Sequence, residues 1–206
     1  MSVSESVNNR VLRMKLGVPF SINGFYKLGS LTSVQKAMSR LAKEGVIERV
    51  SKGIYVRPKP LASIPSIKTI ASAEQVAKHW AKENGYKLVR QGQEAAYRLG
   101  LQTQAPVKSI YWTNGPSREF KIGNERVLVK HISEKKLRWI GKPEGALLRS
   151  LAVLSPESVE LANIKTAISR LSLSGQEAVS ILHKLSHLVV LQHWRNKLQE
   201  FERLLA

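Results

Sequence analysis

Apolar residues recur at helical spacing through the first part of the chain. Residues 3–16 and 20–28 each predict a helix, and Gly29 ends the second of them. A third helix follows, because Ser30 or Thr32 can cap its start. One stripe of this third helix is apolar and is formed by Leu31, Val34, Met38 and Leu41. The polar residues left for its free face are Thr32, Ser33, Gln35, Lys36, Ser39, Arg40 and Lys43.

A two-stranded hairpin is predicted after this helix. Residues 46–50 and 54–57 alternate between apolar and polar side chains, and the segment Ser51-Lys52-Gly53 between them suits a tight turn. Three helices followed by such a hairpin are typical of a winged helix-turn-helix, in which the third helix contacts DNA and the hairpin is the wing. The alternative interpretation is a helix-turn-helix that serves only as a packing module. The candidate DNA-binding residues of the wing are Arg49, Lys52, Tyr55 and Arg57.

The chemistry of the third helix favours DNA. Its free face carries hydroxyls, one amide and long cations, which are the groups that contact phosphates and base edges in the major groove. Arginine and lysine recognise guanine there, and glutamine recognises adenine. We therefore predict double-stranded DNA as the partner of this region.

Prolines and serines interrupt the pattern over residues 57–68 and predict a domain junction, either a flexible hinge or an ordered strap. Beyond it, a capping box at residues 72–75 predicts a helix that ends near Gly85, and a second short helix ends at Gly100. The strands that follow, 107–113, 118–122 and 126–132, predict a small antiparallel sheet. This sheet carries a candidate basic surface formed by Arg118, Lys121, Arg126 and Lys130.

The last third of the chain is predicted to be helical. Helices are expected to start at Pro143, at Ser155-Pro156 and at Ser174, and apolar stripes over residues 161–171, 179–188 and 198–205 suit a bundle. The predicted fold class is therefore α+β. It comprises a winged helix-turn-helix domain over 1–60, a small mixed α/β domain with antiparallel strands over 69–140, and a C-terminal helical bundle over 141–206 packed on that domain.

Charge supports a polyanionic partner. The net charge is +18 and the pI is about 10.4. Residues 1–60 and 61–140 each carry +8, whereas residues 141–206 carry only +2. The basic surface is thus expected in the first two thirds of the chain, with DNA as the first partner and RNA or an acidic protein as the alternatives.

Composition also excludes several kinds of chemistry. The chain has no cysteine, which rules out disulfides, thiol catalysis and thiolate zinc sites and predicts a reducing, cytoplasmic location. No apolar run of about eighteen residues occurs, so no membrane span is predicted. All 15 acidic residues are glutamate, and the paired aspartates that usually hold Mg²⁺ in nucleases and nucleotidyl transferases are absent. We assign no catalytic residue and no cofactor, and predict that the protein is not an enzyme.

Two patterns resemble metal or nuclease sites. His183 and His187 stand four residues apart and share a helix face, but no glutamate directly follows His183, the chain has no cysteine or aspartate to complete a shell, and His193 is offset by a change of segment, so we predict no metal site. Glu134-Lys135-Lys136 resembles the end of a restriction-nuclease motif, but no aspartate precedes it. A nucleic-acid-processing enzyme would need a cluster of glutamates instead, and this remains a competing hypothesis.

Two stretches resemble a known family. The segments GVIERVSKGIYVRP and QGQEAAYRLGLQTQAPVKSIYWTNGPSREFKIGNERVLVKHI are similar to those of AbiEi-type antitoxins of bacterial abortive-infection, or type IV, toxin–antitoxin systems. The resemblance covers roughly residues 1 to 140 and implies an N-terminal winged helix that binds the operator of its own operon and represses it. It also implies a domain needed for antitoxicity and a separate nucleotidyltransferase-like toxin. The alternatives are a stand-alone winged-helix transcriptional regulator, or an RNA-binding or interaction protein, without a cognate toxin.

Overall fold

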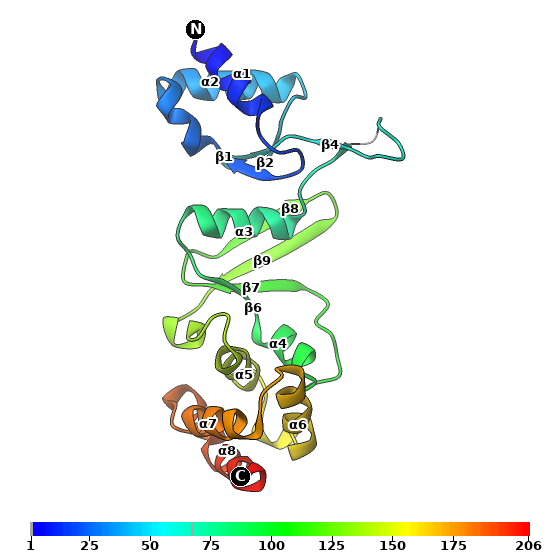
Figure 1. The fold of residues 1–206 in the computed structure, drawn as a ribbon. Helices are drawn as coiled ribbons and strands as arrows, with labels where there is room; N and C mark the ends of the chain where they lie inside the picture. Colours follow the sequence, from blue (N-terminus) through cyan, green and yellow to red (C-terminus); the bar gives the residue numbers. More distant parts are fainter. Residues whose placement is uncertain (1, 67) are drawn as a thin grey trace. The chain divides into compact units, whose positions relative to one another are not determined.

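The computed structural model describes residues 2–66 and 68–206 and shows a mixed α+β protein, as predicted (Figure 1). It divides into two compact units. The first comprises Met1–Tyr86 and Glu119–Val127, and the second comprises Lys87–Arg118 and Leu128–Ala206. The limits of these two units differ from those of the three predicted segments. One reason is that residues 119–127 pack with the first unit.

The N-terminal part of the first unit combines helices with a small sheet. In chain order its elements are α1 (Val3–Leu12), β1 (Pro19–Ser21), the 3₁₀ helix η1 (Ile22–Leu28), α2 (Leu31–Lys43), β2 (Glu48–Ser51) and β3 (Ile54–Val56). The strands form an antiparallel sheet in the order β1-β3-β2. Ser2 caps α1 in a capping box with Glu5, and the Ser30 hydroxyl accepts a hydrogen bond from the Ser33 amide at the start of α2.

The α-helix predicted over residues 20–28 is wrong. Residues 19–21 form strand β1 instead, in which Phe20 pairs with Tyr55 of β3, and only a 3₁₀ helix follows. Pro19, which has no backbone N–H to donate, begins this strand at the edge of the sheet. The first helix is also shorter than predicted, since α1 ends at Leu12.

The buried face of α2 is close to the prediction. Val34, Met38 and Leu41 are buried, but Leu31 is 54% exposed and Ala37 is buried in its place. The buried stripe is therefore centred between Val34 and Leu41, and Leu31 lies at its edge. This face packs against the buried valines of α1, the phenylalanines of β1 and η1, and Tyr55 of β3.

The predicted junction is partly ordered. Strands β4 (Lys59–Pro60) and β5 (Lys68–Thr69) pair with each other in antiparallel fashion, and the Thr69 hydroxyl donates to the Lys59 carbonyl. Ile67 lies outside the described residues. Side chains from Lys59 to Ser66 are exposed, so this short ribbon adds little to the core.

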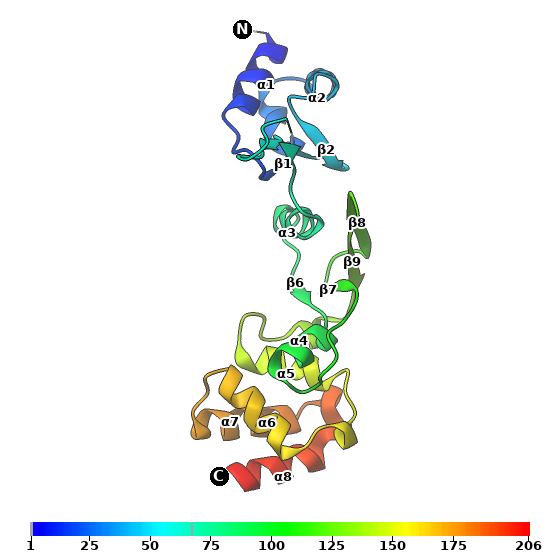
Figure 2. The same cartoon turned by 90° about the vertical axis from the view of Figure 1, so that its right-hand side faces the viewer.

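The C-terminal part of the first unit is a helix on a hairpin. Helix α3 (Ala73–Glu83) begins with the predicted capping box at Ser72 and lies against the strands β8 (Arg118–Ile122) and β9 (Glu125–His131). The rings of Trp80 and Phe120 lie 5.5 Å apart, and the Ala73 amide donates to the Glu125 carboxylate. Figures 1 and 2 show α3 beside this hairpin in both views.

The second unit begins with β6 (Leu88–Arg90), which pairs with β7 (Ser109–Thr113) in antiparallel fashion. The full strand order is β6-β7-β9-β8, and the division between the units cuts through the strands β8 and β9. A sheet is therefore present where one was predicted, with β6 and β7 antiparallel, and each of the three predicted strands begins and ends within two residues of its predicted limits.

Helices form the rest of the second unit (Figure 2). They are α4 (Gly92–Leu99), the 3₁₀ helix η2 (Glu134–Leu137), α5 (Pro143–Leu151), η3 (Pro156–Ser158), α6 (Leu161–Arg170), α7 (Gly175–Ser186), η4 (Val189–Trp194) and α8 (Arg195–Leu205). The predicted starts at Pro143 and Ser174 are confirmed. Ser155-Pro156, however, opens only a single 3₁₀ turn, and α6 begins after Glu160.

A single core holds these helices together. Trp194 is fully buried among apolar residues of α5, α7 and α8, and its indole N–H donates to the Leu151 carbonyl at 2.8 Å. Leu198 and Phe201 of the predicted last stripe are buried, but Leu204 is 58% exposed. The predicted bundle is thus present, and its last stripe is completed by the partly buried Leu205 instead of Leu204.

Candidate nucleic-acid interface

Helix α2 presents a polar ridge to solvent. Thr32, Lys36, Ser39 and Lys43 recur at intervals of four, three and four residues, which places them in one row along the helix, and all four are exposed. Gln35 and Arg40, also exposed, flank this row on either side. We call these six residues the α2 ridge. Helix α2 contains no acidic residue, so the ridge is wholly neutral or positive.

Ser33 does not belong to the ridge. It is half-buried, and its hydroxyl accepts a hydrogen bond from the Ser30 hydroxyl at 2.8 Å. The Ser30 hydroxyl also lies 3.2 Å from the Thr32 hydroxyl. Ser33 is therefore part of the cap at the start of α2, and its predicted role in DNA contact is not supported by its position.

The β2–β3 hairpin exposes two of the four predicted residues. Arg49 and Lys52 are exposed, and Gly53, with a φ of +74°, completes the turn next to Lys52. Tyr55 is only 7% exposed, and its ring stacks on Phe20 with the ring centroids 6.2 Å apart. The ring of Tyr55 is thus part of the core, and its position does not support the predicted contact with DNA.

Arg57 has a structural position instead of the predicted DNA contact. Its Nη1 donates to the carbonyls of Leu12 at 2.6 Å and of Met14 at 2.9 Å, just after the end of α1. A cation that satisfies the last carbonyls of a helix also complements the negative end of the helix dipole. Arg57 therefore fixes the loop that joins α1 to β1.

Replacing Arg57 with alanine is expected to lower the free energy of unfolding by about 1–3 kcal/mol, because two charge-assisted hydrogen bonds are lost. Urea denaturation measures this loss. Arg13→Ala is the matched control, since Arg13 is exposed and a surface substitution of this kind changes stability by about 0.5 kcal/mol or less. Equal stabilities of the two variants would contradict the role of Arg57.

The candidate basic surface is only partly realised. In the first unit, Lys121 and Arg126 alternate with the buried Phe120 and Val127 and so lie on the outer face of the hairpin, but Arg126 Nε pairs with the Glu119 carboxylate at 2.7 Å. In the second unit, Lys130 is exposed, whereas Arg118 is half-buried. The four predicted residues therefore differ in exposure and in ion pairing, and they do not form one uniform basic surface.

A concave surface on the first unit was not singled out from the sequence. A cavity of about 470 Å³ is lined by Ser6, Asn9, Arg10, Arg13 and Leu28. The guanidinium of Arg10 lies 5.0 Å from the centre of the Phe25 ring, which holds it in place. In the sequence these arginines resemble any solvated helix face, and only the turn at η1 shows that they border a hollow.

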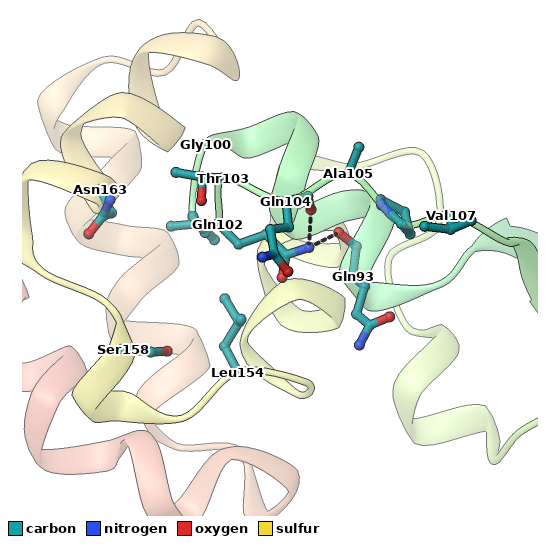
Figure 3. A pocket seen from close by; sticks show the side chains of 12 residues that line it. Gln93, Gly100, Gln102, Thr103, Gln104, Ala105, Val107, Leu154, Ser158 and Asn163 are labelled. Atoms are coloured by element: carbon teal, nitrogen blue, oxygen red, sulfur yellow. Dashed lines mark hydrogen bonds between the residues drawn. The ribbon is translucent and has the colours of Figure 1, made fainter.

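The second unit has a cavity of about 560 Å³ between the end of α4, the loop that follows it, and α6 (Figure 3). Gln102 Nε2 donates to the carbonyls of Gln93 and Gln104, which braces this loop. The polar lining residues are Gln93, Gln102, Thr103, Gln104, Ser158 and Asn163. None of the residues that line this cavity is charged, so it offers no acid, base or phosphate-binding cation.

The glutamates considered for metal-dependent chemistry do not gather. Within residues 2–66 and 68–206, no group of three or more histidine and glutamate side chains is placed to hold a metal ion. Glu134 accepts a hydrogen bond from the Lys87 ammonium at 2.6 Å and another from the Asn114 amide, and the Lys87 contact lowers the pKa of this carboxyl. Glu94 instead pairs with Arg98 at 2.8 Å.

In the described part of the chain, every helix is too short or too polar to span a bilayer.

Comparison with known proteins assigns the chain to a family. No curated protein matches it. Among solved structures, a crystal structure of the RV2827C protein from Mycobacterium tuberculosis matches with 13% sequence identity and a TM-score of 0.45, covering 98% of this chain and 80% of that one. The model described as "Family of unknown function (DUF6088)" matches residues 6–179. Because this match spans most of the sequence, the chain belongs to the DUF6088 family.

Proposed function

We propose that the protein binds double-stranded DNA in a sequence-specific manner through a winged helix-turn-helix formed by α1, η1, α2 and the β2–β3 hairpin. The α2 ridge carries this proposal. In this ridge a row of hydroxyls and lysines has the amide of Gln35 on one side and Arg40 on the other, and helix α2 contains no acidic residue. Such a face can bind phosphates with its cations and recognise base edges with Gln35 and Arg40.

The hairpin supports the same function. Lys52 stands at its turn, where a wing would approach the phosphate backbone, and Arg49 is exposed on the strand that leads to it. The core beneath the ridge joins α1, α2 and β3, so both elements rest on one packed body. The proposed contact surface therefore consists of the α2 ridge with Arg49 and Lys52.

We further propose that the DNA is the operator of the protein's own operon and that the protein is an antitoxin of the AbiEi type. The support for this step is the similarity of residues 45–58 and 91–132 to those antitoxins, and no catalysis is assigned. Co-expression with a nucleotidyltransferase-like protein encoded next to it tests the antitoxin role. Rescue of growth is expected, and growth arrest that the protein leaves unchanged would limit the function to transcriptional regulation.

DNA binding is tested with the sequence upstream of the gene and a shuffled duplex of equal length and composition. Affinity for the upstream sequence should be at least about 10³-fold higher and should fall steeply with salt, because counterions are released from the phosphates. The same titration with a single-stranded RNA of equal length separates DNA from RNA recognition. Equal affinity for the upstream and shuffled duplexes would contradict sequence-specific binding.

Lys52→Ala is expected to weaken binding to all duplexes alike and to reduce the slope of log affinity against log salt by about one unit, since one phosphate contact is lost. The measurement is duplex affinity at several salt concentrations. Lys165→Ala on α6 is the matched control, because it removes an exposed lysine from the second unit. A slope that Lys52→Ala leaves unchanged would place the hairpin turn away from the DNA.

A further inference from the structure

Two histidines meet at the end of α7. His183 lies in the last turn of this helix and His187 is its C-terminal capping residue, so their side chains leave the same face. The centres of their rings are 4.5 Å apart, and both residues are exposed. Two histidines four residues apart on a helix are common, so their spacing alone does not indicate a binding site. The contacts of the two rings decide whether the pair can bind a ligand.

Both rings are held through the same nitrogen. His183 Nδ1 lies 3.0 Å from a carboxylate oxygen of Glu202 on α8, and His187 Nδ1 lies 2.8 Å from the backbone carbonyl of His183. A carboxylate and a carbonyl only accept hydrogen bonds, so Nδ1 must carry the proton in each ring. In the neutral imidazoles, both Nε2 atoms therefore keep a free lone pair.

We propose that His183 and His187 bind one divalent cation of the zinc type through their Nε2 atoms, with water completing the coordination shell. Histidine nitrogen is a preferred ligand of Zn²⁺. The Glu202 carboxylate and the His183 carbonyl orient the two rings as outer-shell partners usually do in metal sites. The site also lies at the negative end of the α7 dipole, where a cation is favoured.

This inference revises the prediction made from the sequence. The sequence shows the four-residue spacing but not the contact that orients His183, because Glu202 is nineteen positions away and becomes its partner only when α8 packs on α7. The alternative is that both rings only cap the end of the helix. A capping role requires no affinity for a metal ion, so metal binding separates the two interpretations.

The experiment is a titration of the full-length, tag-free protein with Zn²⁺ in competition with a chromophoric chelator. One ion per chain is expected, together with a rise in Tm, because the ion binds the folded state. His183→Ala and His187→Ala should each lower the affinity at least tenfold. Glu202→Gln should lower it by about 10–100-fold, as expected for an outer-shell partner.

His193→Ala is the matched control, since His193 is also exposed in the second unit and has no part in the site. Far-UV circular dichroism shows whether each variant is folded, and the NMR signals of the two imidazoles report Zn²⁺ binding in the unmodified protein. Affinity that both single histidine variants leave unchanged, or that His193→Ala lowers equally, would overturn the proposal. So would imidazole signals that do not move when Zn²⁺ is added.

Discussion

Replacing Trp194 with alanine is expected to destabilise the protein by about 3–5 kcal/mol, the cost of removing a fully buried large aromatic side chain. Trp194 has no exposed surface and packs among the apolar residues of α5, α7 and α8. Its indole also donates to the Leu151 carbonyl at the end of α5, which alanine would leave without this donor. The loss is measured by urea denaturation monitored by far-UV circular dichroism, a signal that does not depend on tryptophan fluorescence.

Val189→Ala is the matched control for this prediction. Val189 belongs to the same 3₁₀ helix as Trp194 but is 76% exposed. Its replacement should change the free energy of unfolding by no more than about 0.5 kcal/mol. A loss below 1 kcal/mol for Trp194→Ala would show that the core of the second unit does not depend on this ring.

Arg40→Ala is expected to cost about 1–3 kcal/mol of binding free energy on the operator and clearly less on an unrelated duplex. Arg40 is exposed at one edge of the α2 ridge, where its fork of donors can reach a base edge. The loss should therefore concentrate at one base pair of the operator. Affinities for the operator and for its single-base variants measure this effect.

Arg40→Lys separates base recognition from charge. Lysine keeps the positive charge but lacks the planar, bidentate geometry of arginine. The salt dependence should then stay unchanged while the preference for the operator falls. Equal losses on all sequences for Arg40→Ala would make Arg40 a phosphate contact.

Locally encoded elements were the most predictable part of the fold. The capping boxes at Ser72 and Ser174 and the left-handed glycine at position 100 depend only on residues within a few positions, and all three are confirmed. The strand at residues 19–21 was missed because it is defined by pairing with β3, more than thirty residues away. Local periodicity contains no information about such a partner.

The candidate interface shows the same limit. The exposure of the α2 ridge follows from helical spacing, because the opposite stripe is apolar. The positions of Tyr55 and Arg57 depend on Phe20 and on the end of α1, which distant segments bring near them. A polar or aromatic residue on a short strand therefore cannot be assigned to solvent or to the core from its alternation alone.

The hairpin of residues 119–127 limits how the two units can recombine in evolution. The first unit includes it, although residues 87–118 of the second unit precede it in the gene. A fragment that ends at Tyr86 would leave Trp80 without the Phe120 ring and Ala73 without the Glu125 carboxylate. A single recombination crossover near residue 86 would therefore separate residues 119–127 from the rest of the first unit, and we expect both units to evolve as one linked gene.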